Sequence, residues 1–215
     1  MPTRKAARRG GQAVGMPPGY PEQHDRHARP GKPAVAHGME KSPSMRKAAK
    51  PRVVVSKCLG FAACRYDGTM APDAFVEGLK GRVTFRPVCP EMEIGLGCPR
   101  DPIRLVLLEG KRRLVQPLTG KDLTARMRRF SRSFLDSLGR VDGFILKARS
   151  PSCGIRDAKI FAGPDDRAPI AFGSGLLAEA VLERFPELAI EDEVGLTDRE
   201  TCKEFLGRLF ACGQP

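Results

Sequence analysis

Three cysteines each follow a short apolar run at the point where the run ends. Cys58, Cys89 and Cys153 lie in segments that also contain glycine or proline, such as KARSPSCG at residues 147–154. Thiolates are ligands for soft metals, so three of them brought together could bind iron or zinc. A cysteine can also be no more than a small apolar core residue. The repeated placement, rather than any one cysteine, therefore predicts a metal site.

Histidine is missing from the part of the chain that these cysteines occupy. All three histidines, His24, His27 and His37, lie in the first quarter of the sequence. Imidazole base catalysis, a cysteine-histidine dyad and a zinc site of cysteine and histidine are therefore excluded for residues 51–215. Any chemistry there must use cysteine, carboxylate, hydroxyl, lysine or arginine side chains.

The number of cysteines bears on the cellular compartment in which the protein is expected. The chain has seven cysteines, an odd number, and no apolar stretch typical of an export signal or a membrane span. The sequence thus predicts a cytoplasmic protein with free or metal-bound thiols and no membrane association. It gives no prediction of the oligomeric state.

The elements that would position the cysteines alternate between strands and helices. Apolar or β-branched runs predict strands, and apolar residues at three- and four-residue steps predict helices. We expect strands at 52–56, 82–88, 141–146 and 188–190, a hairpin at 103–108 and 113–116, and helices at 72–80, 122–138, 175–185 and 198–211. This order predicts an α/β fold over residues 51–215: a single Rossmann-like domain with a mainly parallel sheet and helices on both faces.

Parallel strands end at the same edge of a sheet, where α/β folds place their ligand sites. Cys58, Cys89 and Cys153 follow three of the expected strands, so we expect their thiols to converge. An all-thiolate site favours an iron-sulfur cluster, with zinc and an open fourth position as the alternative. A [4Fe-4S] cluster held by only three cysteines would leave one iron open to act as a Lewis acid.

The first 50 residues form a basic tail. Residues 1–52 hold 12 lysines and arginines against 3 acids, out of 37 and 25 in the whole chain. Frequent glycine and proline with few large aliphatic residues predict that residues 1–50 are disordered. Their charge suits weak binding of nucleic acid. Alternatively, translation begins downstream at Met39 or Met45.

Three segments, in order along the chain, resemble the thiouracil desulfurase family. They are SKCLGFAACRYDG (56–68), PVCPEMEIGLGCPRDPIRL (87–105) and KARSPSCG (147–154), and the resemblance extends over about residues 51–210. It implies a [4Fe-4S] cluster on three cysteines and removal of sulfur from thiolated pyrimidines, with thiouridine in tRNA as the substrate of some members. By motif position, the cluster ligands would be Cys58, Cys89 and Cys153.

The chain departs from the family pattern at two places. Leu59 stands alone where the family usually has two leucines before the glycine, and Cys98 replaces a small apolar residue. An extra thiol, from Cys98 or from Cys64, could therefore contact the cluster. As a fourth ligand, it would close the open iron.

The expected reaction is a hydrolysis without net redox change. The soft thiocarbonyl sulfur of 2- or 4-thiouracil would bind the open iron, water would add to the ring carbon, and sulfur would leave as hydrosulfide. Glu91 is the first candidate for the base and Asp67 the second, although Asp67 precedes Gly68 and could simply form a turn. Ser150 and Ser152 could hydrogen-bond a cluster sulfide or the pyrimidine edge, or cap the loop.

Basic side chains occur beside the third cysteine and on the longest expected helix. Lys147 and Arg149 could hold an anionic group, balance the cluster charge or lie on the surface. Four arginines within 126–132 could contact RNA, but few aromatic residues accompany them, so base stacking is not indicated.

Two other functions fit the same cysteines. A noncatalytic sensor would bind iron or zinc and report its state to a partner through the basic tail. A sulfur carrier would form a persulfide on Cys153.

Overall fold

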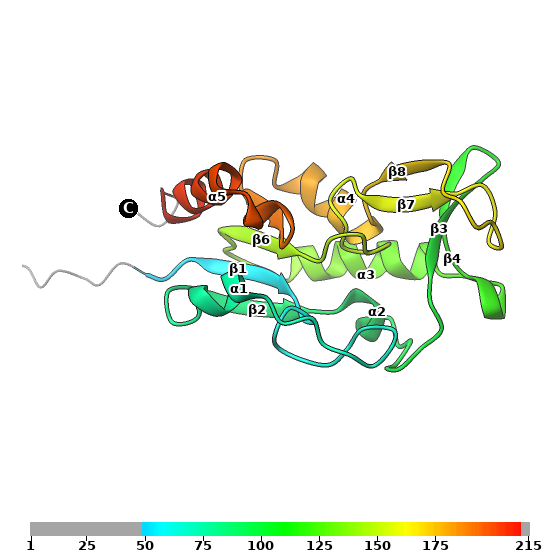
Figure 1. Ribbon diagram of the computed structural model, residues 1–215, viewed down its shortest axis with the longest axis horizontal. Coiled ribbons are helices and arrows are strands. Elements are labelled where there is room, and N and C mark those ends of the chain that lie inside the picture. Colours follow the sequence, from blue (N-terminus) through cyan, green and yellow to red (C-terminus); the bar gives the residue numbers. More distant parts are fainter. Residues whose placement is uncertain (1–48, 212–215) are drawn as a thin grey trace, which may run out of the picture. The chain divides into compact units, whose positions relative to one another are not determined.

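A computed structural model describes residues 49–211 of the chain (Figure 1). These residues form two β-sheets, a four-stranded one in the order β2-β1-β6-β9 and a five-stranded one in the order β5-β4-β3-β7-β8. Apart from Ala49 and Lys50, the basic tail expected at residues 1–50 lies outside the described residues, as does Cys212.

The four-stranded sheet is entirely parallel. It consists of β1 (Arg52–Ser56), β2 (Thr84–Val88), β6 (Gly143–Leu146) and β9 (Ala189–Asp192), with β1 between β2 and β6. Residues 53–55 of β1 are buried on both faces of the sheet, which explains the uninterrupted apolar run in the sequence.

Helices cover both faces of this sheet, so the predicted α/β fold is confirmed. Successive side chains of a strand point to opposite faces. Val53 and Val55 of β1 pack in one core cluster with α1 (Ala74–Leu79) and α5 (Arg199–Ala211). Val54 packs in another cluster with α3 (Thr124–Asp136) and α4 (Leu176–Arg184).

The five-stranded sheet is mixed and was only partly predicted. The expected hairpin is present as β3 (Arg104–Leu108) and β4 (Lys111–Gln116), extended by β5 (Lys121–Asp122). A second pair, β7 (Ala158–Phe161) and β8 (Ala171–Gly173), joins it through parallel pairing of β3 with β7. These added strands have two to four residues. A short helix, α2 (Pro90–Glu93), was also not predicted.

Helix α3 links the two sheets. Near its start, Met127 packs with Leu105 and Leu114 of the mixed sheet. Near its end, Leu135 packs with Val54 and Phe144 of the parallel sheet. A helix of 13 residues is about 20 Å long, enough to reach both cores.

The longest helices of the described part of the chain, α3 and α5, have 13 residues each. No helix within residues 49–211 is both long and apolar enough to cross a membrane.

The KARSPSCG loop packs tightly against the start of α4. The backbone N–H groups of Leu177 and Ala178 both donate to the Ser152 carbonyl, and Gly175 donates to Gly154. A Cβ atom on Gly175 would lie only 2.4 Å from the Ser152 carbonyl carbon. Glycine at position 175 therefore allows the helix and the loop to meet.

We predict that Gly175→Ala lowers the free energy of unfolding by about 1–3 kcal/mol, because the added methyl group overlaps backbone that cannot move without disturbing α4. Gly207→Ala is the matched control: Gly207 lies in α5, and a Cβ atom there would have no atom within 4 Å apart from the neighbouring backbone of its own helix. At this position alanine should stabilise the protein by about 0.5–1 kcal/mol. Urea denaturation of both variants measures the difference, and equal effects would refute the close packing.

Candidate functional site

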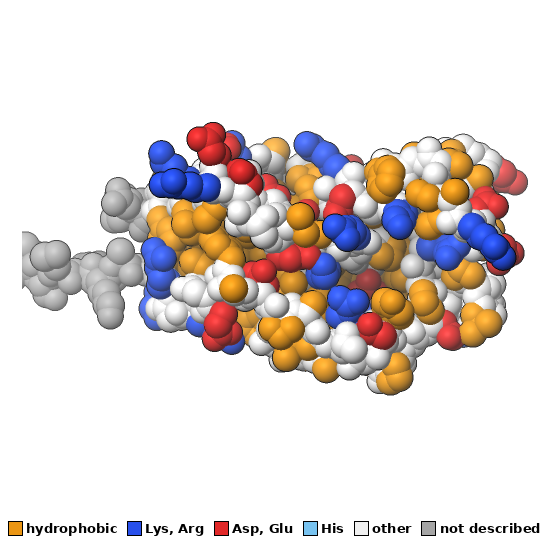
Figure 2. Space-filling model, viewed as in Figure 1, with side chains coloured by type: hydrophobic (Ala, Val, Ile, Leu, Met, Phe, Trp, Pro, Cys, Tyr) orange, Lys and Arg blue, Asp and Glu red, His pale blue; other side chains and the backbone are white. Residues whose placement is uncertain are grey.

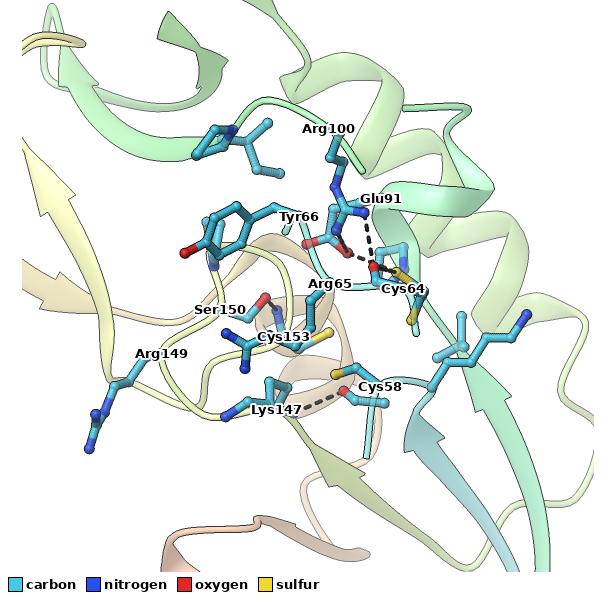
Figure 3. A pocket seen from close by; sticks show the side chains of 18 of the residues that line it. Cys58, Cys64, Arg65, Tyr66, Glu91, Arg100, Lys147, Arg149, Ser150 and Cys153 are labelled. Atoms are coloured by element: carbon cyan, nitrogen blue, oxygen red, sulfur yellow. Dashed lines mark hydrogen bonds and ion pairs between the residues drawn. The ribbon is translucent and has the colours of Figure 1, made fainter. Parts of the chain in front are cut away.

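The loops after β1, β2 and β6 meet at one edge of the parallel sheet and line a single cavity of about 490 Å³ (Figure 3). Cys58 follows β1 by two residues, Cys89 follows β2 directly, and Cys153 lies in the loop after β6. All three line the cavity. Figure 3 shows the Cys58 and Cys153 side chains turned toward each other. The structure thus brings together the three cysteines that the sequence placed after strand ends.

The surroundings of the cavity thiols raise their pKa values. Burial raises the pKa of Cys58 to about 11; Cys64 adds to the shift and Lys147 opposes it. Burial, and then the charge of Glu91, raises the pKa of Cys89 and of Cys153 well above the ordinary value. A metal centre would supply the positive charge that such buried thiolates need.

Hydroxyl groups support Cys153 from two sides. The Ser150 Oγ accepts hydrogen bonds from the backbone N–H groups of Ser152 and Cys153, at 3.1 and 3.0 Å. The Ser56 Oγ accepts from the Lys147 backbone N–H at 2.9 Å, which ties the end of β1 to the end of β6. Hydrogen bonds from Ser56 and Ser150 to the Cys153 sulfur lower its pKa, but not enough to offset the burial.

Ser150 and Ser152 lie differently although both flank Pro151. Ser150 lines the cavity, whereas Ser152 does not and is fully buried. The Ser152 carbonyl holds the start of α4, and its Oγ has no hydrogen-bond partner among the described residues. Only one of the two predicted serines therefore reaches the cavity.

The turn after Cys153 depends on close packing. A Cβ on Gly154 would lie 2.5 Å from the Asp157 Oδ1 and 2.9 Å from the Ser150 carbonyl oxygen. On the other side of the loop, Arg149 has a left-handed φ of 61°, and its backbone N–H donates to the Asp157 Oδ2 at 2.7 Å. These contacts fix the path by which Cys153 reaches the cavity.

Glu91 is the carboxylate inside the cavity. It lies in α2, directly after the end of β2, and is 7% exposed. Its Oε2 accepts a hydrogen bond from the Cys89 Sγ at 3.4 Å and lies 3.8 Å from the Arg100 guanidinium. Of the two carboxylates considered from the sequence, Glu91 is thus the one beside the thiols.

Asp67 forms a surface turn instead. It is exposed and does not line the cavity. Its Oδ1 accepts hydrogen bonds from the backbone N–H and the hydroxyl of Thr69, at 3.0 and 2.6 Å, and these bonds lower its pKa. This is the turn-forming alternative that the following glycine suggested.

Arg100 is a residue of the site that the sequence analysis did not identify. Its side chain is only 7% exposed, and it donates to the carbonyl oxygens of Cys64 and Gly97, at 2.9 and 3.1 Å. Together with its contact to Glu91, this places a buried cation against the loop that follows β1. An arginine after proline carries no sequence signal for such a position.

The additional thiol of the cavity is Cys64, not Cys98. Cys64 is buried and lines the cavity with the three expected cysteines. Cys98 does not line it, and its Sγ donates to the backbone carbonyls of Ala63 and Arg65, at 3.2 and 3.3 Å. The sequence left open whether Cys98 or Cys64 supplies an extra thiol, and of these two Cys64 lines the cavity while Cys98 does not.

The donor set suits a cluster better than a single ion. Within residues 49–211, no three or more His, Cys, Asp or Glu side chains form a group that could hold one metal ion. Cys58, Cys89 and Cys153 all line the cavity wall. A cluster takes each thiolate on a different iron, so its ligands need not meet at one point.

The wall of the cavity is strongly basic. Among the described residues, Glu91 is the one acid that lines it, against five lysines and arginines: Lys57, Arg65, Arg100, Lys147 and Arg149. Figure 2 shows Lys and Arg side chains around the hollow in the middle of this face. Lys147 is paired with Glu193, whereas Arg149 extends away from the thiols in Figure 3. The excess positive charge suits thiolates and an anionic ligand.

The chain is similar to known proteins over the segments that build this cavity. The model of the 2-thiouracil desulfurase family matches residues 53–193. The uncharacterized protein YbbK of Bacillus subtilis (strain 168) is 28% identical over 150 residues, which cover 66% of this chain and 97% of YbbK. The solved structure of the [4Fe-4S]-dependent thiouracil desulfidase TudS is 28% identical with a TM-score of 0.54, covering 72% of this chain and 99% of that chain.

We predict that Arg100→Met lowers the free energy of unfolding of the cluster-free protein by roughly 3–5 kcal/mol, because it leaves the buried Glu91 carboxylate without a cation. Adding Glu91→Gln to the same chain should restore part of the loss, since a neutral amide is easier to bury. Urea denaturation of the single and double variants gives the coupling between the two residues.

Arg129→Met is the matched control, because Arg129 is exposed on α3. Its effect should stay within about 0.5 kcal/mol. A loss of stability for Arg100→Met no larger than this control would contradict the buried ion pair.

Proposed function

The chain belongs to the 2-thiouracil desulfurase family, and we propose that it removes sulfur from thiolated pyrimidines with a [4Fe-4S] cluster held by Cys58, Cys89 and Cys153. One observation carries the proposal: three thiols from three distant segments line one cavity at the carboxyl ends of β1, β2 and β6. The similarity to TudS, whose name specifies the same cofactor and reaction, supports it.

When bound to Cys58, Cys89 and Cys153, a [4Fe-4S] cluster would supply a Lewis acid that polarises the thiocarbonyl group of the substrate through its soft sulfur atom. The overall reaction is then hydrolysis: thiouracil and water give uracil and hydrogen sulfide, with no electron gained or lost. The protein must hold the ring, deliver the water and handle the protons.

We assign Glu91 as the general base that activates the attacking water. Of the described residues it is the only acidic one in the cavity wall, and it lies beside Cys89, so a water between ring and carboxylate would be within reach of both. Its Oε2 would take the proton as the water oxygen adds to the ring carbon, and would return it to the leaving sulfur. Arg100 positions Glu91 from behind, at 3.8 Å.

Ser150 completes the set of proposed functional side chains. Its hydroxyl accepts from the backbone N–H groups of Ser152 and Cys153, so it can hold the Cys153 loop and still face a ligand in the cavity. We assign Asp67 to its turn and Ser152 to the junction with α4, because neither lines the cavity.

The proposed substrates are 2- and 4-thiouracil. A cavity of about 490 Å³ is within the usual size of small-molecule sites. Thiouridine in nucleosides and in tRNA carries the same sulfur-bearing ring, so both belong in the same assay as the free bases. The proposal places the enzyme in the cytoplasm, where cysteines stay reduced.

We predict that Cys58→Ala, Cys89→Ala and Cys153→Ala each abolish both cluster binding and desulfurization, since a cluster that loses one of three ligands is no longer held. The wild-type chain, reconstituted without oxygen, should carry four irons and four sulfides and release uracil and sulfide from 2-thiouracil. Cys202→Ala, in α5, should behave like the wild type.

Iron and sulfide analysis measures cluster binding, and detection of uracil measures desulfurization. A loaded cluster without activity on any thiopyrimidine would instead indicate a sensor. Activity without iron, accompanied by sulfane sulfur on Cys153, would indicate a sulfur carrier.

We predict that Glu91→Gln keeps the cluster but lowers the rate of desulfurization by roughly 10²–10⁴-fold, the usual contribution of a general base. Glu93→Gln is the matched control, because Glu93 lies in the same short helix but is exposed. Iron content and initial rates are measured for both. Equal rates in the two variants would remove Glu91 from the proposed mechanism.

A further inference from the structure

The cavity contains one more thiol than the proposed function uses. Cys58, Cys64, Cys89 and Cys153 all line it, while three cysteines suffice to hold the cluster. Cys64 is 4% exposed, as deeply buried as Cys89 and Cys153. It belongs to the loop between β1 and α1, six residues after Cys58.

Cys64 contacts one of the proposed cluster ligands directly. The Cys89 Sγ is 3.6 Å from the Cys64 carbonyl oxygen, to which it donates. The Cys64 thiol also lines the same cavity as the thiols of Cys58 and Cys89. Figure 3 shows Cys64 beside Glu91 and Arg100, on the side of the cavity where the proposed base lies.

The backbone around Cys64 is fixed so that its thiol faces inward. Its carbonyl oxygen accepts from the buried Arg100 side chain at 2.9 Å, and its N–H donates to Ala62 at 3.0 Å. The next residue, Arg65, donates its N–H to the Thr69 carbonyl and closes the turn. Cys64 is buried, yet it belongs to none of the apolar core clusters of residues 49–211, so core packing alone does not explain a thiol at this position.

We propose that Cys64 is a fourth, displaceable ligand, which occupies the open iron position of the cluster until the substrate sulfur replaces it. This inference rests on the proposed function, since it requires the cluster on Cys58, Cys89 and Cys153. As the substrate sulfur forms its bond, Cys64 would leave the iron as a thiolate with its own electron pair and take up a proton from the solvent. On its return it would bind again as a thiolate and give that proton to the departing hydrosulfide, which leaves as hydrogen sulfide. No electron is transferred.

A displaceable thiolate would serve the enzyme between turnovers. A cluster with an open iron is exposed to water, oxygen and chelators at that corner. A fourth thiolate from a buried, pre-positioned side chain would protect the corner without preventing a soft sulfur ligand from entering.

The test compares the full-length wild type with Cys64→Ala and Cys98→Ala, each reconstituted with ⁵⁷Fe in the absence of oxygen. Mössbauer spectroscopy distinguishes irons with different ligands, and a chelator assay measures the rate of iron loss. In the substrate-free wild type and in Cys98→Ala, we expect four thiolate-like irons. In Cys64→Ala, we expect the same iron content, a separate signal from one iron in four, and severalfold faster iron loss. Adding 2-thiouracil should produce the separate signal in the wild type as well.

Three outcomes would overturn the inference. A separate iron signal already present in the substrate-free wild type would show that Cys64 does not bind. Identical spectra and rates of iron loss for wild type and Cys64→Ala would show the same. Loss of iron content in Cys64→Ala would make Cys64 a permanent ligand. A wild type that takes up no cluster would refute the proposed function itself, which separates the two failures. Cys64→Ser, which keeps the side-chain volume, replaces Cys64→Ala if the alanine variant does not fold.

Discussion

The parallel pairing of β2, β1 and β6 is the constraint on which the site depends. Ser56 pairs with Val88, and Val55 pairs with Ile145, so the three strands end close to the same level. Because they run in the same direction, the loops that carry the three cysteines must leave from one edge. A slip of one residue in either pairing would turn buried side chains to the wrong face, so the packed core maintains the register.

The apolar core supplies the stability, and the loops at its edge carry the chemistry. Core clusters on both faces of the parallel sheet leave β1 fully enclosed. Helix α3 extends this core to the mixed sheet, and the segment leading into β3 brings Pro102 and Ile103 to the cavity wall. The second sheet is therefore part of the site as well as of the fold.

The charges of the cavity wall favour the binding of negatively charged groups. Burial raises the pKa values of the thiols, while the described residues of the wall present five cations and a single carboxylate. The one carboxylate is itself held by the buried Arg100. A metal centre would supply positive charge to the sulfur atoms, and an anionic group of a ligand would interact favourably with the lysine and arginine side chains of the wall.

The sequence by itself determined the α/β fold, most of the elements, and the convergence of Cys58, Cys89 and Cys153 at one edge. These follow from local periodicity and from the direction of parallel strands, both of which are visible in a single chain. It did not reveal the strands that complete the second sheet, where β7 pairs with β3, a strand far away in the sequence. Only the tertiary structure decided which candidate side chains reach the cavity: Cys64 rather than Cys98, Glu91 rather than Asp67, and Ser150 rather than Ser152. It also showed that the Arg100 side chain supports the site by donating to the Cys64 carbonyl oxygen. Whether a loop side chain faces inward depends on contacts with segments far away in the sequence, and no local pattern encodes those contacts.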